Sequence, residues 1–195
     1  MDNENAAKLA VLIDADNAPG AVVVAAVLRH QTIGEAMDLP DEAAYRLWSA
    51  VHEVGHATAL LGTGHGDVTR CQVMLYPGAA HNAFTDASWT DLRGRLALLH
   101  GGMLAAERWL RECGWWDPRR ERASRAANVH DRRAIDELEP WDLVLRATRE
   151  WTAAILDERW PQVLHTAQEL ATRGQLTGSQ LREQLGFPAA RPDRE

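Results

Sequence analysis

The sequence predicts a mainly helical protein with a small β element, an α+β fold. Apolar residues recur at helical spacing over several long segments, whereas only a few short segments have the β-branched residues and alternation typical of strands. A composition of 46% hydrophobic and 25% charged residues suits one globular core. We therefore expect one domain over residues 41–187, preceded by an N-terminal extension over residues 1–40 and followed by a flexible tail over residues 188–195.

The N-terminal extension starts with a strand-like segment. Residues 9–13 form an apolar run with two β-branched members, and Asp14, Asp16 and Asn17 follow it, which predicts a buried strand ending in a polar turn. The next apolar run, Ala21–Leu28, is far shorter than the roughly 18 to 20 residues that cross a bilayer. The acidic N-terminus lacks the features of a signal peptide. We expect a cytoplasmic protein without a membrane partner.

The first long helix is predicted from Asp41 to about Leu61. Asp41 can cap it and Glu42 lies in its first turn, and the glycines at 62, 64 and 66 are expected to break it. Thr69–Tyr76 alternates enough to predict a strand, which Pro77 stops. We expect the stretch Ala79–Ala87 to be a loop.

The second half of the chain is predicted to be helical. A helix is expected over Thr90–Arg111, ended by Gly114, and the charged segment Trp115–Asn128 fits either an exposed loop or a solvated helix face. Helical segments are then expected near residue 130, over residues 141–159, over residues 161–172 and in a short stretch that ends at residue 185.

The charge and the cysteines exclude some classes of function. A net charge of −7 argues against a surface built to neutralise phosphates, so no nucleic-acid partner is expected. The spacing of Cys71 and Cys113 fits neither a zinc ribbon nor a disulfide framework, and we expect two free thiols.

The first long helix contains the pattern His52-Glu53-Val54-Gly55-His56, which is H-E-x-x-H. Residues four apart on a helix lie one turn above each other, so His52 and His56 can bind one Zn²⁺. Glu53 lies beside that face, where it can hold the attacking water, accept its proton and deliver it to the leaving amine. The pattern also arises by chance in unrelated proteins. Here the flanking residues are apolar, and burying two histidines and a glutamate without partners would be costly, which favours a zinc site.

Four segments in order resemble the peptidase domain of FtsH-type ATP-dependent zinc metalloproteases. His52–Ala57 is similar to its H-E-A-G-H-A segment, and His65–Pro77 to the segment of its edge strand. Leu99–Leu110 is similar to its L-G-G-R-x-A-E-E helix, and Trp151–Leu185 to its C-terminal helices. The resemblance implies a zincin-like helical metallopeptidase domain over residues 41–187, with Zn²⁺ as cofactor.

The resemblance also implies a third zinc ligand, an aspartate on a later helix. The matching stretch is Ala126-Ala127-Asn128-Val129-His130-Asp131, and Asp131 is our choice. The family has an alanine four residues after its aspartate, and counting back from Ala134 gives His130 instead, so His130 stays an alternative. Glu107 is a competitor because other H-E-x-x-H enzymes take a glutamate from a later helix, but the resemblance gives it a structural or supporting position.

The sequence also departs from that family. The ATPase module, with its G-x-x-x-x-G-K-[ST] loop, and the membrane helices have no counterpart here, and Met103 replaces the arginine of G-G-R. Lys8–Pro19 resembles the opening strand of NYN-type, PIN-like ribonuclease domains. About 40 residues before the peptidase helix are too few for a complete nuclease, so a metal-dependent nuclease based on Asp14 and Asp16 is the weakest hypothesis.

The leading hypothesis is a stand-alone, soluble, ATP-independent zinc endopeptidase with Glu53 as the catalytic residue and His52, His56 and Asp131 as zinc ligands. Its partner would be an unfolded or extended protein or peptide substrate, which could pair with Thr69–Tyr76 as an edge strand. A homo-oligomer or a separate ATPase chain is a further expected partner. The alternative is a non-catalytic, peptidase-like regulatory or binding module with structural zinc, against which the presence of Glu53 argues.

Overall fold

The computed structural model describes residues 37–76 and 80–189. The strand expected at residues 9–13 and the nuclease-like segment Lys8–Pro19 lie outside these residues, as do most of the N-terminal extension and the last six residues of the tail.

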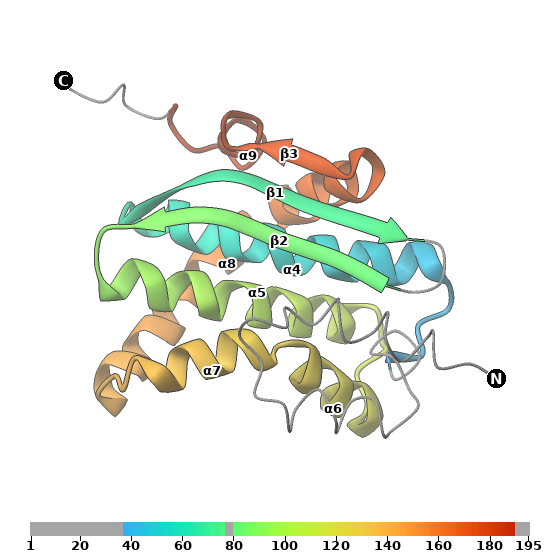
Figure 1. The fold of residues 1–195 in the computed structure, drawn as a ribbon, viewed down its shortest axis with the longest axis horizontal. Coiled ribbons are helices and arrows are strands. Elements are labelled where there is room, and N and C mark those ends of the chain that lie inside the picture. Colours follow the sequence, from blue (N-terminus) through green and yellow to red (C-terminus); the bar gives the residue numbers. More distant parts are fainter. Residues whose placement is uncertain (1–36, 77–79, 190–195) are drawn as a thin grey trace.

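The described chain is mainly helical and carries one small antiparallel sheet, which confirms the predicted fold class. Figure 1 shows the strands β1 and β2 crossing over α4, with α5 beside α4 and with α6 and α7 along the far side of α5. The elements are α4 (Glu42–Thr63), β1 (Gly66–Tyr76), β2 (Ala80–Trp89), α5 (Leu92–Glu112), α6 (Pro118–Ala127), α7 (Val129–Glu137), α8 (Asp142–Arg173), β3 (Gln175–Thr177) and α9 (Gly178–Gln184).

The helix α4 is the central element of the core. Asp41 caps its N-terminus by accepting a hydrogen bond of 2.8 Å from the backbone N–H of Ala44, as predicted. Its C-terminus is capped by Gly64, whose φ of 70° is in the left-handed region that glycine adopts without strain. Every residue from 48 to 61 except His52 is buried, so α4 packs against neighbours around most of its circumference.

Two glycines allow α4 and α5 to pack closely. A Cβ placed on Gly55 would lie 2.6 Å from the carbonyl oxygen of Gly101, and a Cβ on Gly101 would in turn collide with the carbonyl oxygen of Gly55. Real Cβ atoms do not approach backbone so closely, so both positions require glycine. This contact brings the middle of α5 against the turn of α4 that holds His52 and His56.

The sheet corrects two sequence predictions. Of the stretch Ala79–Ala87, which we expected to be a loop, the described residues 80–87 are strand, because β2 covers Ala80–Trp89 and pairs with β1 in a hairpin. Its polar and small residues give a weak strand signal, and pairing with β1 overrides that preference. The strand predicted at Thr69–Tyr76 is confirmed and runs over Gly66–Tyr76, but it is central in the order β2-β1-β3, so it is not an edge strand.

The helices of the second half also differ from prediction. Trp115–Asn128 contains the helix α6, whose N-terminus is capped by Asp117 and whose first turn contains Pro118. Of the two predicted alternatives for this segment, a loop or a solvated helix, the helix is therefore correct. The two helices expected on either side of Pro161 are one helix, α8. Proline removes a single backbone donor, and the burial of Trp160 and Val163 beside it offsets that loss.

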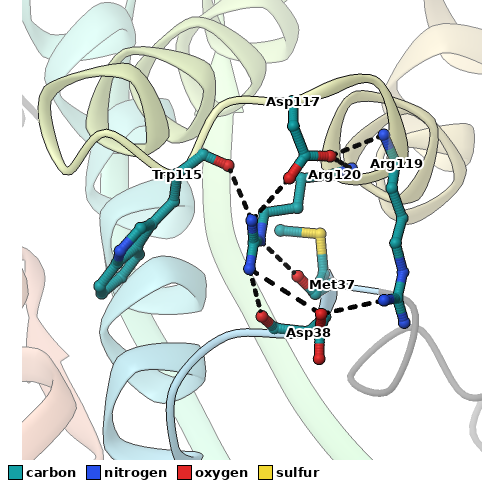
Figure 2. A network of polar contacts seen from close by, with 6 residues as sticks. All are labelled: Met37, Asp38, Trp115, Asp117, Arg119 and Arg120. Atoms are coloured by element: carbon teal, nitrogen blue, oxygen red, sulfur yellow. Dashed lines mark hydrogen bonds and ion pairs between the residues drawn. The ribbon is translucent and has the colours of Figure 1, made fainter.

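A guanidinium fixes the start of α6 to the chain that enters α4. Figure 2 shows Arg120 donating to the carbonyl oxygens of Met37 at 2.9 Å and Asp38 at 2.6 Å, while it pairs with the carboxylate of Asp117 at 2.6 Å. It also reaches the carbonyl oxygen of Trp115 at 3.4 Å. Charge-assisted bonds of this kind are stronger than neutral ones, so this network holds α6 against the N-terminal end of the domain.

Both cysteines are free, as expected, with Cys71 buried and Cys113 exposed. Among the described residues, none of the helices combines the length and the apolar character that a membrane span requires.

Candidate metal centre

Three side chains from two helices meet at one point. His52 and His56 project from the same face of α4, with their Nε2 atoms 2.8 Å apart. An Oδ2 atom of Asp131, from the first turn of α7, lies 3.3 Å from Nε2 of His52 and 3.6 Å from Nε2 of His56. One ligand atom from each of these residues lies within 4.8 Å of the others. They are the only such group of three or more histidine, cysteine or acidic residues in the described part of the chain.

His56 is oriented by the backbone of α5. Its Nδ1 is 2.7 Å from the carbonyl oxygen of Leu98 and donates to it, which leaves a lone pair on the Nε2 atom that faces His52 and Asp131. A metal-binding histidine needs this tautomer. Nδ1 of His52 is buried and has no hydrogen-bond partner among the described residues, so the protein holds His56 in place more firmly than His52.

Asp131 is ionised in this setting. Burial acts to raise the pKa of its carboxyl group, but the neighbouring His56 and the hydrogen bond from His52 outweigh that effect, and the pKa lies below its usual value. The sequence left open whether Asp131 or His130 joins the two histidines. The structure brings Asp131 to them, while His130 is exposed and outside the group, although it lines the same cleft.

Glu53 is buried behind the two histidines. Its Oε2 accepts a hydrogen bond of 2.7 Å from the hydroxyl of Thr85 on β2. Burial raises the pKa of Glu53 to about 7, against the opposing effects of His56 and of the Thr85 hydrogen bond. A carboxyl group with a pKa near 7 can both accept and release a proton at neutral pH.

The three ligand-type residues and Glu53 open on one cleft of about 390 Å³. Its walls come from α4, β2, α5 and the junction of α6 with α7, and they carry both polar and apolar side chains. The other lining residues are Tyr45, Trp48, Ser49, Ala83, Phe84, Thr85, Leu98, Leu99, Ala127, Asn128 and His130. Phe84 and Thr85 are not among the site residues predicted from the sequence, because their strand was expected to be a loop. The turn signal at Pro77 and Gly78 directly after one strand was the available hint of a second strand.

The other candidate residues lie elsewhere. Glu107 is half-buried on α5 and pairs with Arg111 of the same helix at 3.7 Å, outside the group of three. His65 pairs with Asp91 at 2.9 Å, and His100 is buried against α8. Thus none of these three residues competes with Asp131 in the described structure.

The donor set and its geometry fit zinc. Two imidazole nitrogens and one carboxylate oxygen are ligands that zinc accepts, and three protein ligands leave a fourth position for water, as in catalytic sites. In a tetrahedral site with zinc bonds of 2.0–2.2 Å, ligand atoms are roughly 3.3–3.6 Å apart. The two distances from Asp131 match this range, whereas the two Nε2 atoms, at 2.8 Å, would separate slightly around an ion.

No protein-family model matches this chain, and a search of the curated proteins finds no match either.

Proposed function

We propose that this protein is a zinc-dependent endopeptidase that hydrolyses peptide bonds of unfolded or extended protein chains. The observation that carries the proposal is that Glu53 lines the same cleft as His52, His56 and Asp131. A structural zinc site is closed by four protein ligands and needs no base, whereas a hydrolytic site keeps an open position and a proton acceptor beside it.

Each side chain has a distinct part in the proposed reaction. His52, His56 and Asp131 would hold Zn²⁺, which when bound lowers the pKa of water and polarises the scissile carbonyl group. Glu53 accepts a proton from the attacking water and delivers it to the leaving amine.

An extended substrate would pair with β2. This strand pairs with β1 on one side, and within the described residues its other edge carries no strand. Ala83, Phe84 and Thr85 of β2 line the cleft, so a peptide added along this edge would run past the metal centre. This replaces Thr69–Tyr76 as the expected substrate strand.

The substitution Glu53→Gln tests the proposal. The amide keeps the shape of the side chain but cannot accept the proton, so the variant should bind about one zinc per chain and lose roughly 10²- to 10⁴-fold in kcat on casein. Glu107→Gln, the same change on α5 outside the group, should retain wild-type activity. If the zinc-loaded wild type cleaves neither casein nor short peptides, the enzyme hypothesis is wrong and a binding module with structural zinc replaces it.

A further inference from the structure

Thr85 makes a direct contact with the proposed general base. Its hydroxyl lies 2.7 Å from Oε2 of Glu53 and 3.1 Å from the backbone carbonyl oxygen of the same residue. We infer that Thr85 is a positioning residue that holds the Glu53 carboxylate in the orientation needed for proton transfer. The inference rests on the proposed function, because it assigns a role within that reaction.

The hydroxyl of Thr85 has one proton, and three acceptor atoms lie within reach of it: Oε2 and the backbone oxygen of Glu53, and Sγ of Cys71 at 3.3 Å. The Glu53 carboxylate is the nearest of them at 2.7 Å, and an ionised acceptor binds a hydroxyl proton more strongly than a neutral one. Cys71 of β1 is the residue opposite Thr85 in the hairpin. Its Sγ lies 3.6 Å from the carbonyl oxygen of Glu53 and is placed to donate to it. Burial raises the pKa of the Cys71 thiol, so the thiol stays protonated and can act as this donor. The proton of Thr85 is then available to the carboxylate.

The surroundings of Glu53 make this contact important. The side chain is only 5% exposed, and Thr85 provides the side-chain hydrogen bond to its carboxylate within residues 37–76 and 80–189. A general base must lie within about 2.6–3.2 Å of the atom that carries the proton it accepts. Without the hydroxyl, the carboxylate can rotate about its terminal torsion, which has broad minima, and part of the population would point away from the attacking water.

The alternative interpretation is that Thr85 only stabilises the packing of β2 against α4. Thr85→Val removes the hydroxyl and keeps the volume, and Thr85→Ser restores the hydroxyl, so this pair separates positioning from packing. In the positioning role, Thr85→Val binds zinc as the wild type does and keeps KM, while kcat on a fluorogenic peptide falls about 10- to 100-fold, the size expected for one hydrogen bond to a charged group. Thr85→Ser returns kcat to within about threefold of the wild type.

The control variant is Thr69→Val, the same chemical change at an exposed position of β1. It should leave kcat, KM and zinc content at wild-type values. A Thr85→Val protein with unchanged kcat, or one whose defect Thr85→Ser fails to repair, would overturn the inference while leaving the proposed function intact.

A second measurement does not depend on activity. The carboxyl ¹³C resonance of Glu53 in the zinc-free protein can be assigned by its loss in Glu53→Gln. This resonance should shift in Thr85→Val, return in Thr85→Ser and stay in place in Thr69→Val. An unchanged resonance in Thr85→Val means that Thr85 does not hold the carboxylate. Lack of hydrolysis by the wild type would instead contradict the proposed function, so the two failures are distinguishable.

Discussion

Gly102 of α5 lies directly against the imidazole of His56. A Cβ placed on Gly102 would lie 2.5 Å from both Cε1 and Nε2 of His56, and 2.8 Å from Cε1 of His52. These atoms surround the point where the three ligand-type side chains meet. Because residue 102 has no side chain, both imidazole rings fit at this position.

Gly102→Ala should weaken zinc binding at least about tenfold, because the new methyl group displaces rings that must stay in place to within about 0.5 Å. Alanine favours a helix over glycine by about 1 kcal/mol, so a simple propensity effect would stabilise α5. Competition with a chromogenic chelator gives the affinity. Gly62→Ala is the matched control, since the atoms nearest to its new methyl group belong to the Ile155 side chain and to none of the three ligand-type residues. Equal affinities in both variants would contradict the assigned geometry.

Asp131→Ala should weaken zinc binding much more than His130→Ala. His52→Ala and His56→Ala should reduce the affinity by at least about 100-fold, because two remaining protein ligands hold the ion poorly. Asp131→Ala should have an effect of similar size, whereas His130→Ala should stay within about threefold of the wild type, since this exposed side chain lies outside the group. Metal analysis after dialysis tests this order of zinc affinities. A larger loss in His130→Ala would show that His130 is the third ligand.

His100 should make the protein less stable in mild acid. Burial, followed by the nearby Arg149, lowers the pKa of His100 from 6.5 to about 4. The unfolded chain thus binds more protons between pH 4 and 6.5, so the free energy of unfolding is at its full value above pH 6.5 and falls as the pH decreases to 4, by up to about 3 kcal/mol. His100→Asn keeps a donor near the position of Nδ1 but does not titrate. The free energy of unfolding measured in urea should therefore change less with pH in this variant than in the wild type.

The control for that measurement is His165→Asn, at an exposed position of α8. It should reproduce the wild-type pH dependence. If His100→Asn does so as well, His100 is not the group responsible.

Arg120→Met should destabilise the fold by about 2–3 kcal/mol, because the two carbonyl groups and the carboxylate that Arg120 binds lose a largely buried charged donor. Since α6 leads into the helix of Asp131, zinc affinity should also fall. Arg119→Met is the control: its ion pair with Asp38 joins two side chains that are at least half exposed, and such pairs contribute less than about 1 kcal/mol. If urea unfolding shows the same loss of stability for Arg120→Met and Arg119→Met, Arg120 does not have this structural role.

The sequence by itself determined the features that depend on neighbouring residues. Asp41 and the apolar spacing after it predict α4, and the four-residue spacing puts His52 and His56 on one face of that helix. Both follow from the geometry of a single helix, which needs no distant contact. The mainly helical class with a small sheet follows from the same local patterns.

Only the tertiary structure decided the rest. Asp131 and His130 are adjacent in sequence, and the packing of α7 beside α5 decides which of them faces the histidines. The strand β2 forms because β1 lies beside it, although its own residues have little strand preference, and this pairing brings Thr85 to Glu53. Likewise α8 continues through Pro161 because its buried face outweighs one missing hydrogen bond. In each case the deciding free energy comes from contacts between different elements, which the spacing of residues within one element does not contain.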